Sequence, residues 1–165
     1  MNPKSLYRAA LLEYLYCASF TADPAEARVA YRTYRQLAKK GCPDGWFGLG
    51  RARRYGYGVK PNRAKAEKYY RRARKWYARA ALQADATACN NLGFLYHNGK
   101  GVRRSKKLAE KWYKLAARAG SILALSNLGV LYEDAGRLKK AVRYYRRAAE
   151  AGNKYAAKQL KRLDK

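Results

Sequence analysis

The chain has few acidic residues and almost no histidine, and each shortage narrows what the protein can be. Only 11 Asp and Glu stand against 38 Lys and Arg in 165 residues, with a single His. The chain therefore offers few residues for a catalytic centre of paired carboxylates or for a metal site of His and Cys. The three cysteines are Cys17, Cys42 and Cys89, with no CxxC pair. We expect no disulfide framework, and buried thiols in a reducing compartment such as the cytoplasm are the plain interpretation.

Long hydrophobic runs are absent as well. No apolar segment approaches the roughly 18–20 residues of a membrane span, and Glu13 interrupts the N-terminal stretch that superficially resembles a signal peptide. The glycine pairs at 56–58 and 99–101 lack the length and flanking strand of a phosphate-binding loop. The lone His97 has no nucleophile or metal ligand at a meaningful spacing. We therefore expect neither an enzyme nor a metal, cofactor or small-molecule substrate.

The chain is strongly basic, and its composition is that of a protein that folds. Its 48% of hydrophobic residues supports a real core, and its net charge is +27. Residues 42–85 hold 12 basic and 3 acidic side chains, and residues 86–121 hold 8 and 1. Such an imbalance opposes compaction and is usually tolerated for a polyanionic partner.

Internal repetition decides the architecture. Residues 86–121 and 122–153 are copies of one another, while 44–59 opens and 74–85 closes a third copy. The second half of each copy places small residues and one tyrosine on a helical stripe, as in Ala109, Tyr113 and Ala116. The chain is therefore an array of one unit, which favours recognition over chemistry.

The first half of each copy has a glycine in the middle of a helix. These glycines are Gly50, Gly93 and Gly129, each preceded by leucine. A mid-helix glycine costs up to about 1 kcal/mol against alanine. Its recurrence predicts that another helix crosses at this point, where a Cβ would clash.

The patterns LGxLYxxGxGV and AxxWYxxAAxxG resemble the Sel-one-like repeat (SLR) family, a branch of the tetratricopeptide-like α-solenoids. The resemblance implies an all-α, right-handed superhelix of about four helix hairpins plus a C-terminal capping helix. The units are about 4–41, 43–85, 86–121 and 122–153, with the cap at 154–163, in a single domain. The glycine spacing grows from 36 residues (Gly93 to Gly129) to 43 (Gly50 to Gly93), so we expect a second-unit helix lengthened by two turns. In the degenerate first unit, Leu12, Leu15 and Tyr16 match the others, and Asp23-Pro24 is a plausible helix start.

Aligning the second helices brings cations into two columns, roughly opposite the alanine and tyrosine stripe. The columns contain no acid, and their members are Arg28, Arg32, Arg71, Lys75, Lys107, Lys111, Lys139 and Arg143. Flanking positions add Arg35, Arg72, Arg79, Lys114, Arg118, Arg146 and Arg147. One interpretation is an uninvolved solvated face. The other, which we favour, is a convex face that binds nucleic acid through its backbone, most simply the RNA of a ribonucleoprotein assembly.

Two alternatives stay open beside that hypothesis. As the family usually is, the protein could be a protein–protein scaffold that binds an acidic protein or peptide in its concave groove. The resemblance then implies that Asn91 and Asn127 hold the peptide backbone, although hydrogen bonding between helices is the interpretation of these two residues that we favour. An anionic membrane surface is a weaker possibility. Tyr55 and Tyr57 could contact a base or sugar, or staple their own loop.

Overall fold

The computed structural model describes residues 23–163, so Leu12, Leu15, Tyr16 and Cys17 lie outside the described residues. The described chain forms eight helices and no strand. They are α2 (Pro24–Lys39), α3 (Pro43–Tyr55), α4 (Arg63–Ala81), α5 (Ala86–Asn98), α6 (Lys106–Arg118), α7 (Ile122–Glu133), α8 (Leu138–Glu150) and α9 (Lys154–Leu163). The predicted all-α solenoid of helix hairpins with a C-terminal capping helix is confirmed.

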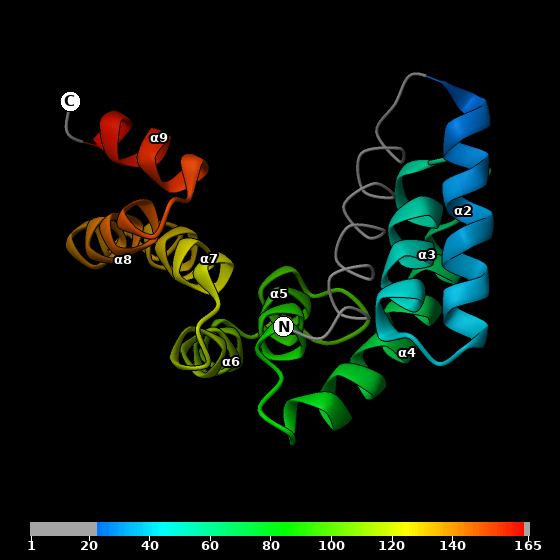
Figure 1. The fold of residues 1–165 in the computed structure, drawn as a ribbon, viewed down its shortest axis with the longest axis horizontal. Helices are drawn as coiled ribbons and strands as arrows, with labels where there is room; N and C mark the ends of the chain where they lie inside the picture. Colours follow the sequence, from blue (N-terminus) through cyan, green and yellow to red (C-terminus); the bar gives the residue numbers. More distant parts are fainter. Residues whose placement is uncertain (1–22, 164–165) are drawn as a thin grey trace. The chain divides into compact units, whose positions relative to one another are not determined.

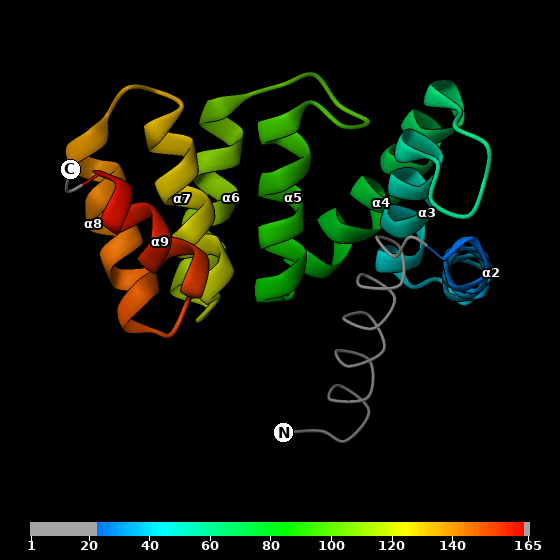
Figure 2. The same cartoon turned by 90° about the horizontal axis from the view of Figure 1, so that it is seen from above.

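The chain divides into two compact units, and the boundary falls inside α4, between Trp76 and Tyr77. Within the second unit, each helix packs on the next one along the chain, from α5 to α9. Because α5 also contacts α7, and α7 contacts α9, these three helices form one layer, while α6 and α8 form the other (Figure 1). Figure 2 shows α5, α6, α7 and α8 as neighbouring rods that run up and down in turn. The two layers give this unit two different faces.

Most of the described helices begin where a side chain accepts from a free backbone N–H, whereas α3 and α8 have no such cap. Asp85 caps α5 by accepting from the Ala88 amide at 2.8 Å. Ser105 and Ser121 do the same for α6 and α7, each at 3.2 Å. Asp23 caps α2, whose first residue is Pro24, as the sequence predicts. These caps satisfy the orphan donors of the first turn and fix each helix start.

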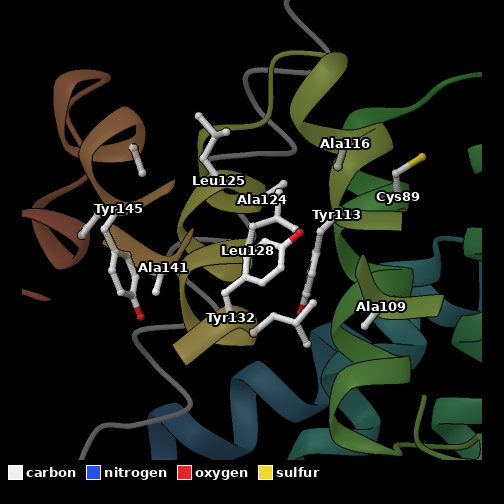
Figure 3. Packing of buried hydrophobic residues seen from close by; sticks show 13 residues of the cluster. Cys89, Ala109, Tyr113, Ala116, Ala124, Leu125, Leu128, Tyr132, Ala141 and Tyr145 are labelled. Carbon is white, nitrogen blue, oxygen red and sulfur yellow. The ribbon is translucent and has the colours of Figure 1, made fainter. Parts of the chain in front are cut away.

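Small residues and tyrosines from successive helices make the core of the second unit (Figure 3). Tyr113 of α6 and Tyr145 of α8 are fully buried. A Cβ built on Gly93 would lie 2.4 Å from Cδ1 of Tyr113, and one on Gly129 would lie 2.4 Å from Cδ1 of Tyr145. The prediction that another helix crosses at each of these glycines is confirmed, since the tyrosine ring of the next helix occupies the space of the missing side chain.

The first unit repeats this contact with an altered helix. Gly50 of α3 meets the ring of Tyr70 in α4, at 2.6 Å from a built Cβ. Helix α4 has 19 residues against 13 in α6 and in α8, so the predicted lengthening is present. Both Tyr70 and Tyr77 are buried along it. The insertion of two turns therefore keeps the apolar stripe in phase.

Candidate binding faces

The eight column cations are all exposed in the structure. In the first unit, Arg28 and Arg32 lie on α2, and Arg71 and Lys75 lie on α4. In the second unit, Lys107 and Lys111 lie on α6, and Lys139 and Arg143 lie on α8. Within the described residues, none of the eight takes part in an ion pair or a hydrogen bond through its side chain. The continuity of the columns from one unit to the other stays a prediction.

Some of the flanking cations have structural partners instead. The Lys114 ammonium lies 2.6 Å from the Glu110 carboxylate, one helical turn away. The Arg72 guanidinium stacks 4.7 Å from the centre of the Trp46 ring. Arg147 lies 5.9 Å from the ring centre of Tyr144. These three side chains are used within the fold, which sets them apart from the column cations.

The acids of the second unit are largely used within the fold. Asp85 caps α5, Glu110 pairs with Lys114, Glu133 binds Arg162 and Tyr145, and Asp134 binds His97. The hydrogen bond from Lys114 lowers the pKa of Glu110, burial opposes this, and the Tyr132 hydroxyl at 2.8 Å lowers it further. Of the acids in residues 77–163, only Glu150 remains without such a contact. The column cations of α6 and α8 are therefore not neutralised by this unit's own carboxylates.

The asparagines expected in the concave groove are tied to their neighbours. Asn127 of α7 donates from Nδ2 to the Asn90 Oδ1 of α5 at 2.9 Å. Asn91 accepts from Asn90 at 3.4 Å. In the first unit the matching residue is Gly48, where a built Cβ would lie 2.2 Å from the Tyr34 ring. The alternative of hydrogen bonding between helices thus describes Asn127, and peptide binding by Asn91 and Asn127 stays a prediction.

Replacing Asn127 by alanine is expected to lower the free energy of unfolding by about 1–2 kcal/mol. The substitution removes the donor to Asn90, whose side chain is buried and would keep an unsatisfied oxygen. Urea unfolding of Asn127→Ala, Asn90→Ala and the double variant measures this. If the two single losses simply add, the hydrogen bond is not an energetic link between α5 and α7.

His97 does have a partner, contrary to what its sequence neighbourhood indicates. Its Nε2 lies 2.9 Å from Oδ2 of Asp134, at the end of α7, and its ring meets the edge of Tyr113 at 6.3 Å between centres. The side chain is 9% exposed. Asp134 was invisible to sequence reasoning because it stands 37 residues away in the next repeat. The pair joins one repeat to the next.

Tyr55 and Tyr57 stack on one another, with ring centres 5.5 Å apart and an interplanar angle of 29°. This is the arrangement of a loop staple, the second of the two interpretations of these residues. The described chain also holds no group of three His, Cys, Asp or Glu side chains placed to bind a metal. Cys42 and Cys89 are free thiols, with Cys89 buried.

The repeat geometry has a match among known protein families. A family model described as the Sel1 repeat matches residues 47–75, 70–85, 86–121 and 122–153. The chain belongs to the Sel1 repeat family. Sel1 repeat proteins are generally adaptors in protein–protein interactions, which agrees with the alternative of a protein-binding scaffold rather than with the favoured hypothesis of nucleic-acid binding.

Similar proteins match this Sel1 repeat chain over most of its length. It is 29% identical to the uncharacterised protein NMB1327 of Neisseria meningitidis serogroup B, over 96% of the chain and 39% of that protein. Among solved structures, a Sel1 repeat protein from Oxalobacter formigenes gives a TM-score of 0.55 at 27% identity, covering 94% of this chain and 69% of the other. The c5321 protective antigen of uropathogenic Escherichia coli, which displays an SLR fold, gives 0.53 at 30% identity, covering 97% and 35%. This Sel1 repeat chain thus spans well under half of NMB1327 and of c5321.

None of the helices described for this Sel1 repeat chain combines the length and the hydropathy needed to cross a bilayer. Sel1 repeat proteins are typically non-enzymatic scaffolds, and the SLR-fold neighbours are of the same architectural kind.

Proposed function

We propose that this protein is a non-enzymatic adaptor that binds an acidic region of another protein through the basic columns of its second helices. The observation that carries the proposal is a set of eight exposed cations that have no ion pair within residues 23–163. In the second unit, the described acids other than Glu150 are used within the fold. Like charges held along packed helices repel one another, and an anionic partner removes that repulsion. Membership of the Sel1 repeat family supports a protein as the partner.

Two observations favour a protein partner over nucleic acid. Tyr55 and Tyr57, the aromatic pair beside the cations of α3, stack on each other rather than offering two free faces. Tyr70, Tyr113 and Tyr145 of the repeat stripe are buried against the glycines of the crossing helices, so their rings are not available for stacking on bases. Contact with phosphate alone would still be possible through the columns, so RNA binding is an outcome that the test must distinguish.

Charge reversal within the second unit tests the columns. The variant, called the column variant below, carries the four substitutions Lys107→Glu, Lys111→Glu, Lys139→Glu and Arg143→Glu. A matched control reverses four other exposed cations of the same unit, Arg103, Lys154, Lys158 and Lys161, and so changes the net charge equally. Fluorescence anisotropy with a labelled oligo-glutamate peptide is expected to show at least a tenfold larger loss of affinity for the column variant, about 1.4 kcal/mol. Circular dichroism checks that both variants fold.

A single-stranded oligouridylate of equal charge, measured at the same salt concentration, separates the partners. The proposal predicts that the parent protein binds this RNA no more tightly than the peptide. Tighter RNA binding by tenfold or more, lost in the column variant, would assign the face to nucleic acid instead. Equal losses in the column and control variants would mean that net charge alone is responsible, and that the columns are not a site.

A further inference from the structure

The second unit contains a cavity of about 350 Å³ that the basic columns do not touch. Most of its lining comes from α5, from α7 and from the residue after α7, whereas the columns of this unit lie on α6 and α8. Its apolar wall comes from Phe94, Tyr113 and Val130. Its polar wall includes His97, Arg104, Asn127 and Asp134. Five of the eight lining residues are polar, and a pocket of this size with convergent polar groups beside an apolar wall suits a small ligand or part of a peptide.

The polar wall is held in place by contacts across elements. The His97 ring is fixed between the Asp134 carboxylate at 2.9 Å and the edge of Tyr113. The Arg104 Nε donates to the His97 carbonyl oxygen at 2.9 Å. Lys106 donates to the carbonyl oxygen of Asp134 at 2.7 Å. These bonds position the wall before any ligand arrives, which reduces the ordering cost of binding.

Two of these side chains keep free hydrogen-bonding groups within the described residues. Arg104 uses only Nε, so both terminal amino groups of its guanidinium are available as a fork of donors. Asn127 uses Nδ2 on Asn90, so its Oδ1 is available as an acceptor. A guanidinium fork matches a carboxylate in two-pronged geometry, and an amide oxygen matches a peptide N–H.

Charge around the cavity selects the ligand's sign. The Asp134 carboxylate on its wall is in hydrogen-bond contact with the His97 ring, with 2.9 Å between Oδ2 and Nε2. Residues 86–121, which supply α5, the following loop and α6, carry 8 basic side chains and 1 acidic. That single acid, Glu110, is paired with Lys114. Asp134 is outnumbered by cations around the cavity. Arg104 lies on the wall, the Lys100 ammonium lies 5.0 Å from the centre of the Phe94 ring, and Lys106 is bonded to the Asp134 carbonyl oxygen. Three cations against one carboxylate favour an anionic ligand.

We propose that this cavity binds a glutamate side chain of a short acidic segment in the partner protein. The carboxylate pairs with the Arg104 fork, the methylene groups lie against Phe94 and Val130, and the segment's backbone N–H donates to Asn127 Oδ1. This inference rests on the proposed function for the nature of the partner, but it places a second contact on the opposite layer from the columns. It also gives Asn127 a binding role beside its structural bond to Asn90.

Titration of the full isotope-labelled chain with acetylated, amidated tri-glutamate, followed by nuclear magnetic resonance, tests the site. We expect chemical-shift changes centred on His97, Arg104, Asn127 and Val130, with affinity at least fivefold higher than for tri-glutamine. Tri-aspartate, whose shorter side chains reach the apolar wall less well, is expected to bind more weakly than tri-glutamate. Shift changes confined to α6 and α8, or equal binding of tri-glutamine, would overturn the inference.

Substitution of Arg104 supplies the matched comparison. Arg104→Gln is expected to weaken tri-glutamate binding at least fivefold, while Arg103→Gln, the same charge loss one residue away and outside the cavity wall, leaves it nearly unchanged. Arg104→Lys keeps the charge but loses the fork, and is expected to bind more weakly than the parent. Equal affinities of Arg104→Gln and Arg103→Gln would overturn the inference.

The same probe separates this inference from the proposed function. The column variant is expected to keep the shift changes at His97 and Asn127, because its four substitutions lie on the other layer. If the column variant loses oligo-glutamate binding while Arg104→Gln binds tri-glutamate as the parent does, the cavity inference is wrong and the proposed function stands. If Arg104→Gln loses binding while the column variant does not, the cavity is a site and the columns are not.

Discussion

Alanine in place of Gly129 is expected to lower the free energy of unfolding by about 2–3 kcal/mol, although alanine is the better helix former by about 1 kcal/mol. The reason is steric. The new Cβ would lie 2.4 Å from Cδ1 and from Cε1 of Tyr145, a side chain that is fully buried and cannot swing into solvent. Helices α7 and α8 would have to move apart, and buried contacts along both would weaken. Urea unfolding followed by circular dichroism measures the change.

A double-mutant cycle identifies the cause. Tyr145→Ala alone is expected to cost about 3–5 kcal/mol because it leaves a cavity in the core. In that background the ring is gone, so Gly129→Ala should cost nothing or stabilise the protein by up to about 1 kcal/mol. The sign of the effect thus reverses between the two backgrounds. An equal loss in both backgrounds would show that the clash with Tyr145 is not why a glycine is present.

The packing of the repeat could be predicted from sequence because its causes are local and recur. The alanine and tyrosine stripe identifies the buried face of each second helix, and the repeated mid-helix glycine identifies where the next helix crosses. The wider spacing between Gly50 and Gly93 predicted a longer helix in the second repeat, and α4, with 19 residues, is longer than α6 and α8. Exposure of Lys107, Lys111 and the other column cations followed from the same helical geometry.

The polar contacts between repeats could not be predicted in the same way. His97 with Asp134, and Asn90 with Asn127, each join residues 37 positions apart. Only the three-dimensional register of α5 against α7 brings them together. Asp134 aligns with Asn98 in the preceding copy, so no repeated carboxylate marks this position in the sequence. The cavity beside His97 depends on these contacts, which is why sequence analysis missed it.

Alkaline unfolding is the second large effect expected of this core. Burial raises the pKa of Tyr70, Tyr113 and Tyr145 far above the ordinary value of about 10, and a hydrogen bond to Glu133 adds to the shift at Tyr145. When the pKa of a tyrosine is higher in the folded state than in the unfolded state, its contribution to stability is fully present below the unfolded-state pKa. That contribution is lost as the pH rises from the unfolded-state pKa toward the folded-state pKa. Above pH 10, each of the three tyrosines lowers the free energy of unfolding by about 1.4 kcal/mol per pH unit. The three together lower it by about 4 kcal/mol per pH unit. We expect cooperative unfolding between about pH 10 and 12, with phenolate absorbance rising in step with the loss of helix.

Lysines also lose their charge over this pH range, which reduces the repulsion within a chain of net charge +27. The variant Tyr113→Phe separates the contribution of one buried tyrosine from this general effect. That relief is shared by the variant and the parent, so it cancels in their difference. Relative to its value at pH 8, the stability of Tyr113→Phe at pH 11 should exceed that of the parent by about 1.4 kcal/mol, since one fewer buried phenol must stay protonated. Urea unfolding of both proteins at the two pH values gives the difference. A stability difference that does not change with pH would mean that Tyr113 ionises without opening the core, and that the tyrosine stripe does not set the alkaline limit of the fold.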